Sequence, residues 1–154
     1  MTLVQKWNRQ HFEPVMLSDL GLVLHLGHLT SEQCPCASVS QVVSLTTLDV
    51  TGIHTLNVKT CQCNKEQGFY RQLLRAWLYP ASHKTPQTVA SFRLLQHFQL
   101  LSFVSKVSVR EYYMALERFS NNTSAISIKD RYCELLRMAW EWCLLKVLKR
   151  HARA

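Results

Sequence analysis

The sequence has little of what marks fibrous, disordered or membrane proteins. Glycine and proline occur only four times each among its 154 residues, which is too few for a collagen-like repeat or a flexible linker. No apolar run approaches the length of a membrane-spanning helix, and residues 1–10 lack the apolar stretch of a secretory signal. We therefore expect a soluble, intracellular protein without a membrane partner.

Acidic side chains are scarce as well. Ten Asp and Glu stand against eighteen Lys and Arg, which gives a formal net charge of +8. This excess favours encounter with an anionic partner such as nucleic acid. Apolar residues make up 47% of the chain, so we expect a continuous hydrophobic core rather than global disorder.

The first part of the chain is rich in β-prone residues. The stretch at 46–58 combines Thr and Val with period-two alternation, and Thr51-Gly52 interrupts it as a turn or bulge. Shorter β-prone runs lie at 15–17, 21–27 and 42–45. We expect each of these runs to form a strand.

From about residue 67 the spacing becomes helical. A short helix is predicted within 69–78, and Thr85-Pro86 predicts the start of a longer helix that carries Val89. Capping-box spacing occurs at 108–111 and again at 127–130. In the final helix we expect Trp140 to lie in the core beside one buried stripe, made of Tyr132, Leu136, Ala139, Cys143 and Val147.

The placement of cysteine is the most informative feature of the chain. Cys61 and Cys63 are two positions apart in a β-prone stretch, so both thiolates would lie on one face of a strand and reach one metal ion. Such close cysteines are poorly placed to bridge each other, and clustered thiols in a reducing compartment more often bind metal than form disulfides. A structural zinc needs four donors, usually Cys sulfur and His nitrogen.

Further donors are available at several positions. His28 and Cys34 are separated by five residues that can turn back and present two ligands. His54 is the alternative ligand, although an unbroken strand would point it to the face opposite Cys61. Cys36 is another candidate, because Cys34-Pro35-Cys36 repeats the alternate spacing.

The remaining patterns predict no active site. Phosphoryl transfer assisted by two metals needs several converging carboxylates, whereas Asp19, Asp49 and Asp130 have plainer roles at turns, strand ends or a helix cap. Cys133 and Cys143 are expected to be small core residues of the last helix. We therefore expect neither catalytic residues nor a small-molecule substrate.

A basic run near the end of the chain is the candidate nucleic-acid contact. Lys146, Lys149, Arg150 and Arg153 could meet phosphates. The competing interpretation is a solvated helix end, where cations are favoured by the helix dipole. The other function that we consider is a protein–protein docking module that acts through the surfaces of Tyr112, Trp140 and Trp142.

Several segments in this order resemble one family. They include Leu26-Gly27-His28, Cys34-Pro35, Gly52-Ile53-His54, Cys61-Gln62-Cys63 and Gln72-Leu73-Leu74-Arg75-Ala76. Over nearly its whole length the chain is similar to the cysteine-cluster domain found upstream of the catalytic domain in Kyakuja-Dileera-Zisupton transposases, which are abundant in mushroom-forming fungi.

The resemblance implies a zinc-chelating accessory module of a DNA-transposing enzyme, acting in the nucleus on DNA, on transposase subunits or on the catalytic domain. Carried over residue by residue, the ligands fall on His28, Cys34, Cys61 and Cys63, with His54 in the Gly-Ile-His motif. The zinc would be structural, with all four positions filled by protein. The fold implied is α+β, with a β-rich, zinc-binding region at 1–66 packed on a helical region at 67–154 as one integrated domain.

The chain departs from the family pattern in two respects. Family members usually carry another Cys/His cluster before the tryptophan that corresponds to Trp7, and the catalytic domain would follow about where this chain stops at Ala154. Cys36 also stands where a proline or polar residue is expected. We therefore expect a non-catalytic accessory domain, or alternatively a decayed transposon remnant without independent activity.

Overall fold

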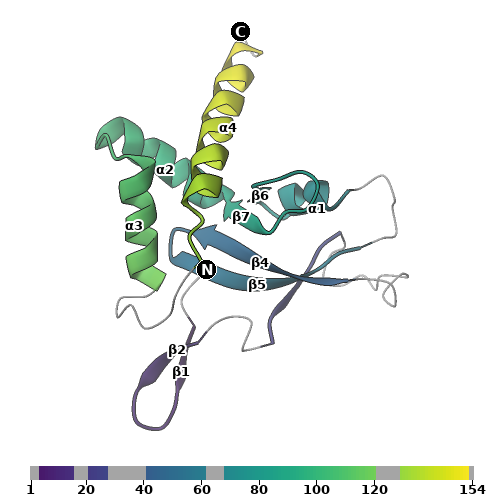
Figure 1. Cartoon of the computed structure of the whole chain (residues 1–154), viewed down its shortest axis with the longest axis vertical. Helices are drawn as coiled ribbons and strands as arrows, with labels where there is room; N and C mark the ends of the chain where they lie inside the picture. Colours follow the sequence, from purple (N-terminus) through teal and green to yellow (C-terminus); the bar gives the residue numbers. More distant parts are fainter. Residues whose placement is uncertain (1–3, 16–20, 28–40, 62–67, 121–128, 153–154) are drawn as a thin grey trace.

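The first two strands form a hairpin that stands apart from the other elements. The computed structural model describes residues 4–15, 21–27, 41–61, 68–120 and 129–152. Strands β1 (Val4–Trp7) and β2 (Phe12–Val15) pair antiparallel. Figure 1 shows this hairpin projecting away from the larger sheet. Only the first residue of the strand predicted at 15–17 lies within the described part of the chain.

Five strands form a mixed sheet in the order β3-β5-β4-β7-β6. β5 pairs with β3 in parallel and with β4 antiparallel, while β7 pairs with β4 in parallel and with β6 antiparallel. The strands are β3 (Val23–His25), β4 (Val42–Asp49), β5 (Gly52–Lys59), β6 (Leu78–Pro80) and β7 (Thr88–Ser91). The sheet thus takes strands from both halves of the sequence.

The hairpin of β4 and β5 has the turn that the sequence predicts. Asp49 pairs with Gly52 across a two-residue loop. Gly52 has a φ of +130°, and a Cβ there would lie 2.6 Å from Oγ of Ser120. That hydroxyl accepts the N–H of Ile53 at 2.5 Å. Glycine is therefore required where the end of α3 meets the hairpin.

The described residues also form four helices: α1 (Phe69–Arg75), α2 (Phe92–Val104), α3 (Val109–Ser120) and α4 (Tyr132–His151). The capping box predicted at the start of α3 is confirmed, since Ser108 Oγ accepts the N–H of Glu111 at 3.2 Å and the Glu111 carboxylate accepts the N–H of Ser108 at 2.9 Å. Before α4, Asp130 accepts the N–H of Tyr132 at 2.8 Å. Ser127, its expected capping partner, lies outside the described residues.

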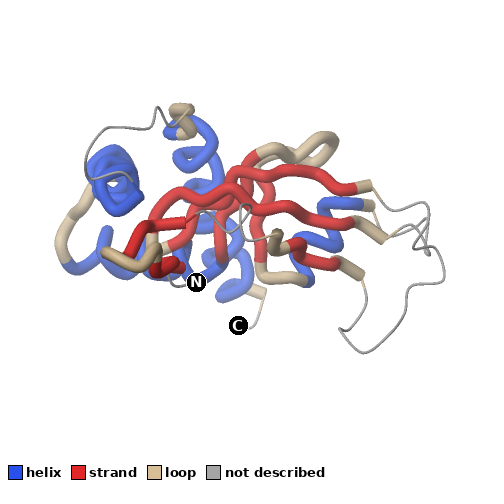
Figure 2. Tube along the Cα trace, turned by 90° about the horizontal axis from the view of Figure 1, so that it is seen from below, coloured by secondary structure: helices blue, strands red, loops and turns tan. Residues whose placement is uncertain are grey.

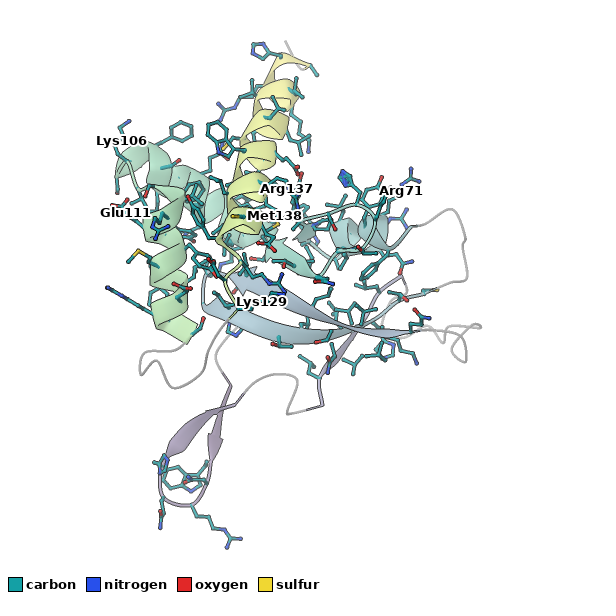
Figure 3. The ribbon with its side chains drawn as sticks, viewed as in Figure 1. Arg71, Lys106, Glu111, Lys129, Arg137 and Met138 are labelled. Carbon is teal, nitrogen blue, oxygen red and sulfur yellow. The ribbon has the colours of Figure 1, made fainter. Side chains whose placement is uncertain are left out.

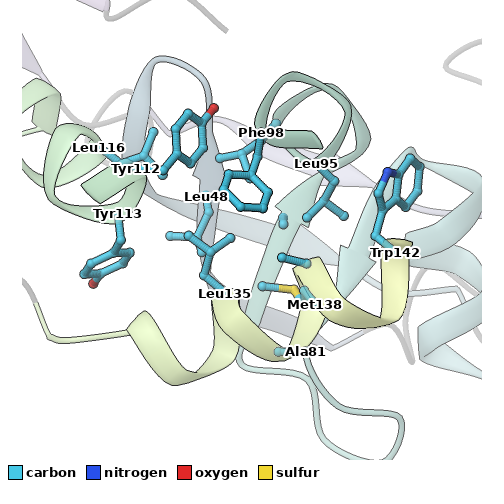
Figure 4. Packing of buried hydrophobic residues seen from close by; sticks show 13 residues of the cluster. Leu48, Ala81, Leu95, Phe98, Tyr112, Tyr113, Leu116, Leu135, Met138 and Trp142 are labelled. Carbon is cyan, nitrogen blue, oxygen red and sulfur yellow. The ribbon is translucent and has the colours of Figure 1, made fainter. Parts of the chain in front are cut away.

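The sheet is buried on both faces, and each face has its own hydrophobic cluster. Successive strand residues point to opposite faces, so Val89 and Ala90 of β7 enter different clusters. The α1 cluster combines sheet residues with Leu73 of α1 and consists of Leu26, Leu45, Leu56, Val58, Leu73, Leu78 and Val89. The helical cluster joins Leu48 and Ala90 to α2, α3 and α4. Figure 4 shows Leu48 surrounded by side chains from these helices.

In Figure 2 the long strands cross the middle of the molecule, with the larger helices grouped at one end. The α+β class predicted from sequence is confirmed. One helix begins later than predicted, however. Val89 lies in β7, opposite Thr47 of β4, and α2 starts only at Phe92. The Thr85-Pro86 start signal is overridden because Val89 is fully buried as a strand residue in the α1 cluster.

The buried face of α4 also differs from the predicted stripe. Its buried residues are Leu135, Met138, Ala139 and Trp142, so only Ala139 belongs to both sets. Trp140, expected in the core, is 71% exposed. This helix has apolar residues nearly all round, so periodicity alone could not select the face that meets α2 and α3.

The two cysteines of α4 are more accessible than a core position requires. Cys133 is exposed and Cys143 is half-buried, and both thiols are free. The expectation that both are core residues is therefore wrong for Cys133. Partial burial raises the pKa of the Cys143 thiol above its ordinary value.

Candidate metal centre

Cys61 lies immediately beyond β5 and is held there by the side chain of Gln72. The Gln72 carboxamide accepts the N–H of Cys61 at 3.1 Å and donates to its carbonyl at 2.7 Å. Gln72 itself is buried in α1. Because both groups of one amide are used, the backbone of Cys61 is fixed in position and orientation against the helix.

Gly27 packs directly on the side chain of Cys61. Its φ is +93°, and a Cβ at this position would lie 2.8 Å from Cβ and 3.7 Å from Sγ of Cys61. Any other side chain would therefore clash with Cβ of Cys61. The residue that follows Gly27 along the chain is His28, which lies outside the described residues.

Three chain segments meet at this end of the sheet. Leu26 donates its N–H to the carbonyl of Lys59 at 2.9 Å, and Thr60 donates to the carbonyl of Gln41 at 3.2 Å. The residues that flank the sequence stretch 28–40 therefore lie beside the end of β5, and Cys61 is the residue before the stretch 62–67. These two stretches contain His28, Cys34, Cys36 and Cys63, which lie outside the described residues.

The alternative ligand His54 lies at the other end of β5. The strand from His54 to Lys59 covers about 17 Å at 3.3 Å per residue, and Cys61 follows beyond it. Ligands of one zinc ion are within about 4 Å of one another, because each is 2.0–2.3 Å from the metal. The structure thus does not bring His54 and Cys61 together.

His54 belongs instead to a hydrogen-bonded chain at the turn. Thr51 Oγ1 donates to Asp49 at 3.0 Å and lies 2.9 Å from Nε2 of His54. Since the single hydroxyl proton of Thr51 is already used, Nε2 of His54 must carry the proton of the second bond. Burial lowers the pKa of His54, and the charge of Asp49 opposes this shift. The neutral imidazole is therefore favoured.

The same chain continues to α2 through Asp49. The other carboxylate oxygen of Asp49 accepts the hydroxyl of Ser91 at 2.5 Å, and Ser91 Oγ accepts the N–H of Leu94 at the start of the helix. Burial opposes ionisation of Asp49, but the bonds from Ser91 and Thr51 outweigh it and leave the pKa of Asp49 below its usual value. The aspartate thus acts as a structural link between hairpin and helix.

The predicted nucleic-acid residues lie at the far end of α4. Lys149 and Arg150 are exposed in its last turn, and Nζ of Lys146 lies 4.8 Å from the centre of the Trp142 ring. Arg153 is outside the described residues. Figure 1 shows this end of α4 extending away from the sheet, so the cations are accessible to a large partner.

Sequence reasoning did not assign a role to Gly27 or Gln72. Both fall within segments that carry the family resemblance, but neither has a side chain that binds zinc. Their effect on Cys61 is visible only when β3, β5 and α1 are assembled. Among the residues that the structure describes, no group of three or more His, Cys, Asp or Glu lies close enough to hold a metal ion.

Comparison with known proteins identifies the chain. No helix in the described segments is both long and apolar enough to cross a membrane. No curated protein and no solved structure gives a significant match. A family model described as a CxC2-like cysteine cluster associated with KDZ transposases matches residues 17–124, a span that includes Gly27, Cys61 and Gln72. It describes an accessory cluster rather than a catalytic domain. The chain therefore belongs to the family of cysteine-cluster domains associated with Kyakuja-Dileera-Zisupton transposases.

Proposed function

We propose that this chain is a zinc-stabilised, non-catalytic accessory domain of such a transposase, with His28, Cys34, Cys61 and Cys63 as ligands. The observation that supports this most directly is the meeting of chain segments around Cys61. Gly27, Gln41 and Cys61 bound the two cysteine-bearing stretches, and each is tied to the same end of the sheet. Thiolate and imidazole donors suit a closed tetrahedral zinc site.

The role of this zinc would be to hold the two cysteine-bearing stretches together at the end of the sheet where Cys61 lies. Four protein ligands leave no position for water, so the metal supplies folding energy rather than hydrolytic chemistry. The aspartates considered for catalysis have structural partners where they are described, Asp49 with Ser91 and Thr51 and Asp130 with Tyr132. This arrangement supports an accessory role.

Elemental analysis of purified variants tests the metal centre. Cys61→Ser is expected to remove stoichiometric zinc, whereas Cys133→Ser, which changes an exposed thiol on α4, should retain it. His28→Ala should lose zinc and His54→Ala should keep it. A Cys61→Ser protein that still holds one zinc per chain would refute the assignment.

We further propose that the end of α4 contacts DNA, which would place the protein's action in the nucleus. The support is the exposed pair Lys149 and Arg150, with Lys146 in the same helix and Arg153 three positions after Arg150 in the sequence, on a chain of net charge +8. Phosphate contacts make affinity fall steeply with salt. In a mobility-shift assay, Lys149→Glu combined with Arg150→Glu should weaken binding and reduce the salt slope, while Lys129→Glu at the opposite end of α4 should not. Figure 3 shows Lys129 at that opposite end.

A further inference from the structure

An apolar groove runs between α4 and the segment that joins α1 to β6. Its volume is about 810 Å³. The aromatic rings of Tyr79, Phe92 and Trp142 form one contiguous cluster along it, with ring centres 5.1–6.5 Å apart. Trp77 lines one side and Leu145 of α4 the other. The groove is thus built from parts of the chain that are well separated in sequence.

Trp77, which lines the groove, has a backbone conformation that is unfavourable for tryptophan. It follows the end of α1 with a φ of +61°, a position where helices usually have glycine. Its ring is 69% exposed and meets Phe92 edge-on at 5.6 Å. A large exposed aromatic residue in a strained conformation is more typical of a functional site than of a core contact.

The outer half of α4 leaves apolar side chains without cover from the described chain. Leu144 and Leu145, which line the groove, are 60% and 42% exposed, and Leu148 is 54% exposed. Contiguous exposed apolar residues of this kind mark protein interaction sites. Tryptophan beside such a patch is the residue type that most often dominates binding energy.

The charged residues of the groove are mostly cationic. Arg75, Lys146 and Lys149 line it, together with a single carboxylate, that of Glu141. Glu141 accepts the hydroxyl of Tyr79 at 2.9 Å. The field at the rim therefore favours a negatively charged ligand.

We propose that this groove docks an acidic amphipathic helix of a partner protein. Leucine or aromatic anchors at helical spacing would fill the apolar floor, and flanking Glu or Asp would face Lys146 and Lys149. A second copy of the chain fits poorly, because its own α4 brings further cations to the same place. Nucleic acid is the competing ligand, because Trp77 offers a ring on which a base can stack, but it would leave the exposed side chains of Leu144 and Leu145 without an apolar partner. The inference deepens the accessory role proposed above but does not depend on the metal centre.

Fluorescence anisotropy with the full chain tests the proposal. The probe is a labelled synthetic peptide of roughly 18 residues, five helical turns, with leucine along one face and glutamate elsewhere. Its control has the same leucines with lysine in place of glutamate. The acidic peptide is expected to bind with a dissociation constant of about 10 μM, and the lysine peptide at least tenfold more weakly.

Matched substitutions locate the site. Trp77→Ala should weaken binding of the acidic peptide by about tenfold or more, whereas Trp140→Ala, which removes an equally exposed tryptophan outside the groove, should leave it unchanged. Lys149→Glu should weaken binding and Lys129→Glu should not. Circular dichroism of each variant checks that the fold is retained.

Three results would overturn the proposal: no binding of the acidic peptide, equal binding of both peptides, or equal loss with Trp77→Ala and Trp140→Ala. Oligothymidylate that binds more tightly than the peptide and is displaced by it would assign the groove to nucleic acid instead. Zinc content is measured on the same samples. A zinc-loaded chain that binds no peptide refutes the groove alone, and a zinc-free chain that binds peptide refutes the metal centre alone.

Discussion

At the scale of single residues, two glycines with positive φ differ in the space that a side chain would have. Gly21 and Gly27 both adopt left-handed conformations, with φ of +70° and +93°. A Cβ at Gly21 would meet no atom within 4 Å, whereas one at Gly27 would meet Cys61 at 2.8 Å. Comparison of the two positions therefore separates the cost of the left-handed backbone from the cost of crowding Cβ of Cys61.

We predict that Gly27→Ala destabilises the protein more than Gly21→Ala does. Left-handed backbone costs each alanine about 1–2 kcal/mol, and crowding against Cys61 should add about 1–3 kcal/mol at Gly27 alone. Urea denaturation of the two variants measures the difference. Equal losses of stability would mean that Gly27 does not constrain Cys61.

Asp49 is a buried carboxylate that links the β4–β5 hairpin to α2. Its folded-state pKa lies below the ordinary value of 3.8, so the folded state binds its proton less readily than the unfolded state. The stabilisation is therefore fully present above about pH 4 and is lost as the pH falls through the lowered pKa. Acid should loosen the link from the hairpin to α2.

We predict that Asp49→Asn lowers the free energy of unfolding at pH 7 by about 1–3 kcal/mol, the usual range for hydrogen bonds to a charged group. The difference between wild type and variant should shrink as the pH falls below about 4, because the unfolded wild-type chain then takes up the proton first and the folded carboxylate follows only at its lowered pKa. Denaturation at pH 7 and pH 3 tests both statements. A constant difference across this range would show that charge is not the cause.

At the scale of elements, local signals set the ends of some helices and not of others. The capping box of Ser108 and Glu111 forms as its spacing predicts. Its hydrogen bonds from the backbone and side chain of Ser108 hold the pKa of Glu111 below its usual value. By contrast, α2 begins only at Phe92, with Ser91 as its N-cap residue, because the residues up to Ser91 are used in β7.

We predict that Ser108→Ala destabilises the protein by about 1 kcal/mol through loss of the cap of α3. Ser108→Thr should retain most of that stability, since the threonine hydroxyl can both accept the N–H of Glu111 and donate to its carboxylate. Thermal denaturation of both variants measures the effect. A loss shared equally by the Thr variant would point to contacts of Ser108 other than the cap.

At the scale of the whole molecule, the sheet divides the hydrophobic core into two clusters. The α1 cluster borders the end of β5 where Cys61 lies, whereas the helical cluster surrounds Leu48. If zinc is bound at the end of β5 near Cys61, its removal should destabilise the α1 cluster more than the helical cluster.

We predict that chelation of zinc reduces hydrogen-exchange protection in β3, the end of β5 and α1 before it affects α2, α3 and α4. Metal binding and folding are coupled at such sites, so the segments that carry ligands should open first. Exchange measured by mass spectrometry with and without chelator tests this order. Unchanged protection throughout would contradict a structural metal.

Several features of the protein were determined by local sequence alone. Examples are the turn at Thr51-Gly52, the capping box at Ser108 and the family motifs around Cys61. Each depends on residues only a few positions apart, so it can be recognised without knowledge of the tertiary structure. The same local character explains why the α+β class was predictable, because strand and helix periods are properties of short windows.

Only the tertiary structure decided which segments meet. The parallel pairing of β3 with β5 places Gly27 on Cys61, and burial in the sheet turns the expected helical start at Val89 into a strand. In α4, an apolar surface on nearly every side left the choice of buried face to packing against α2 and α3. These outcomes depend on contacts between residues far apart in sequence, and the energies of such contacts cannot be predicted from a short window of the sequence.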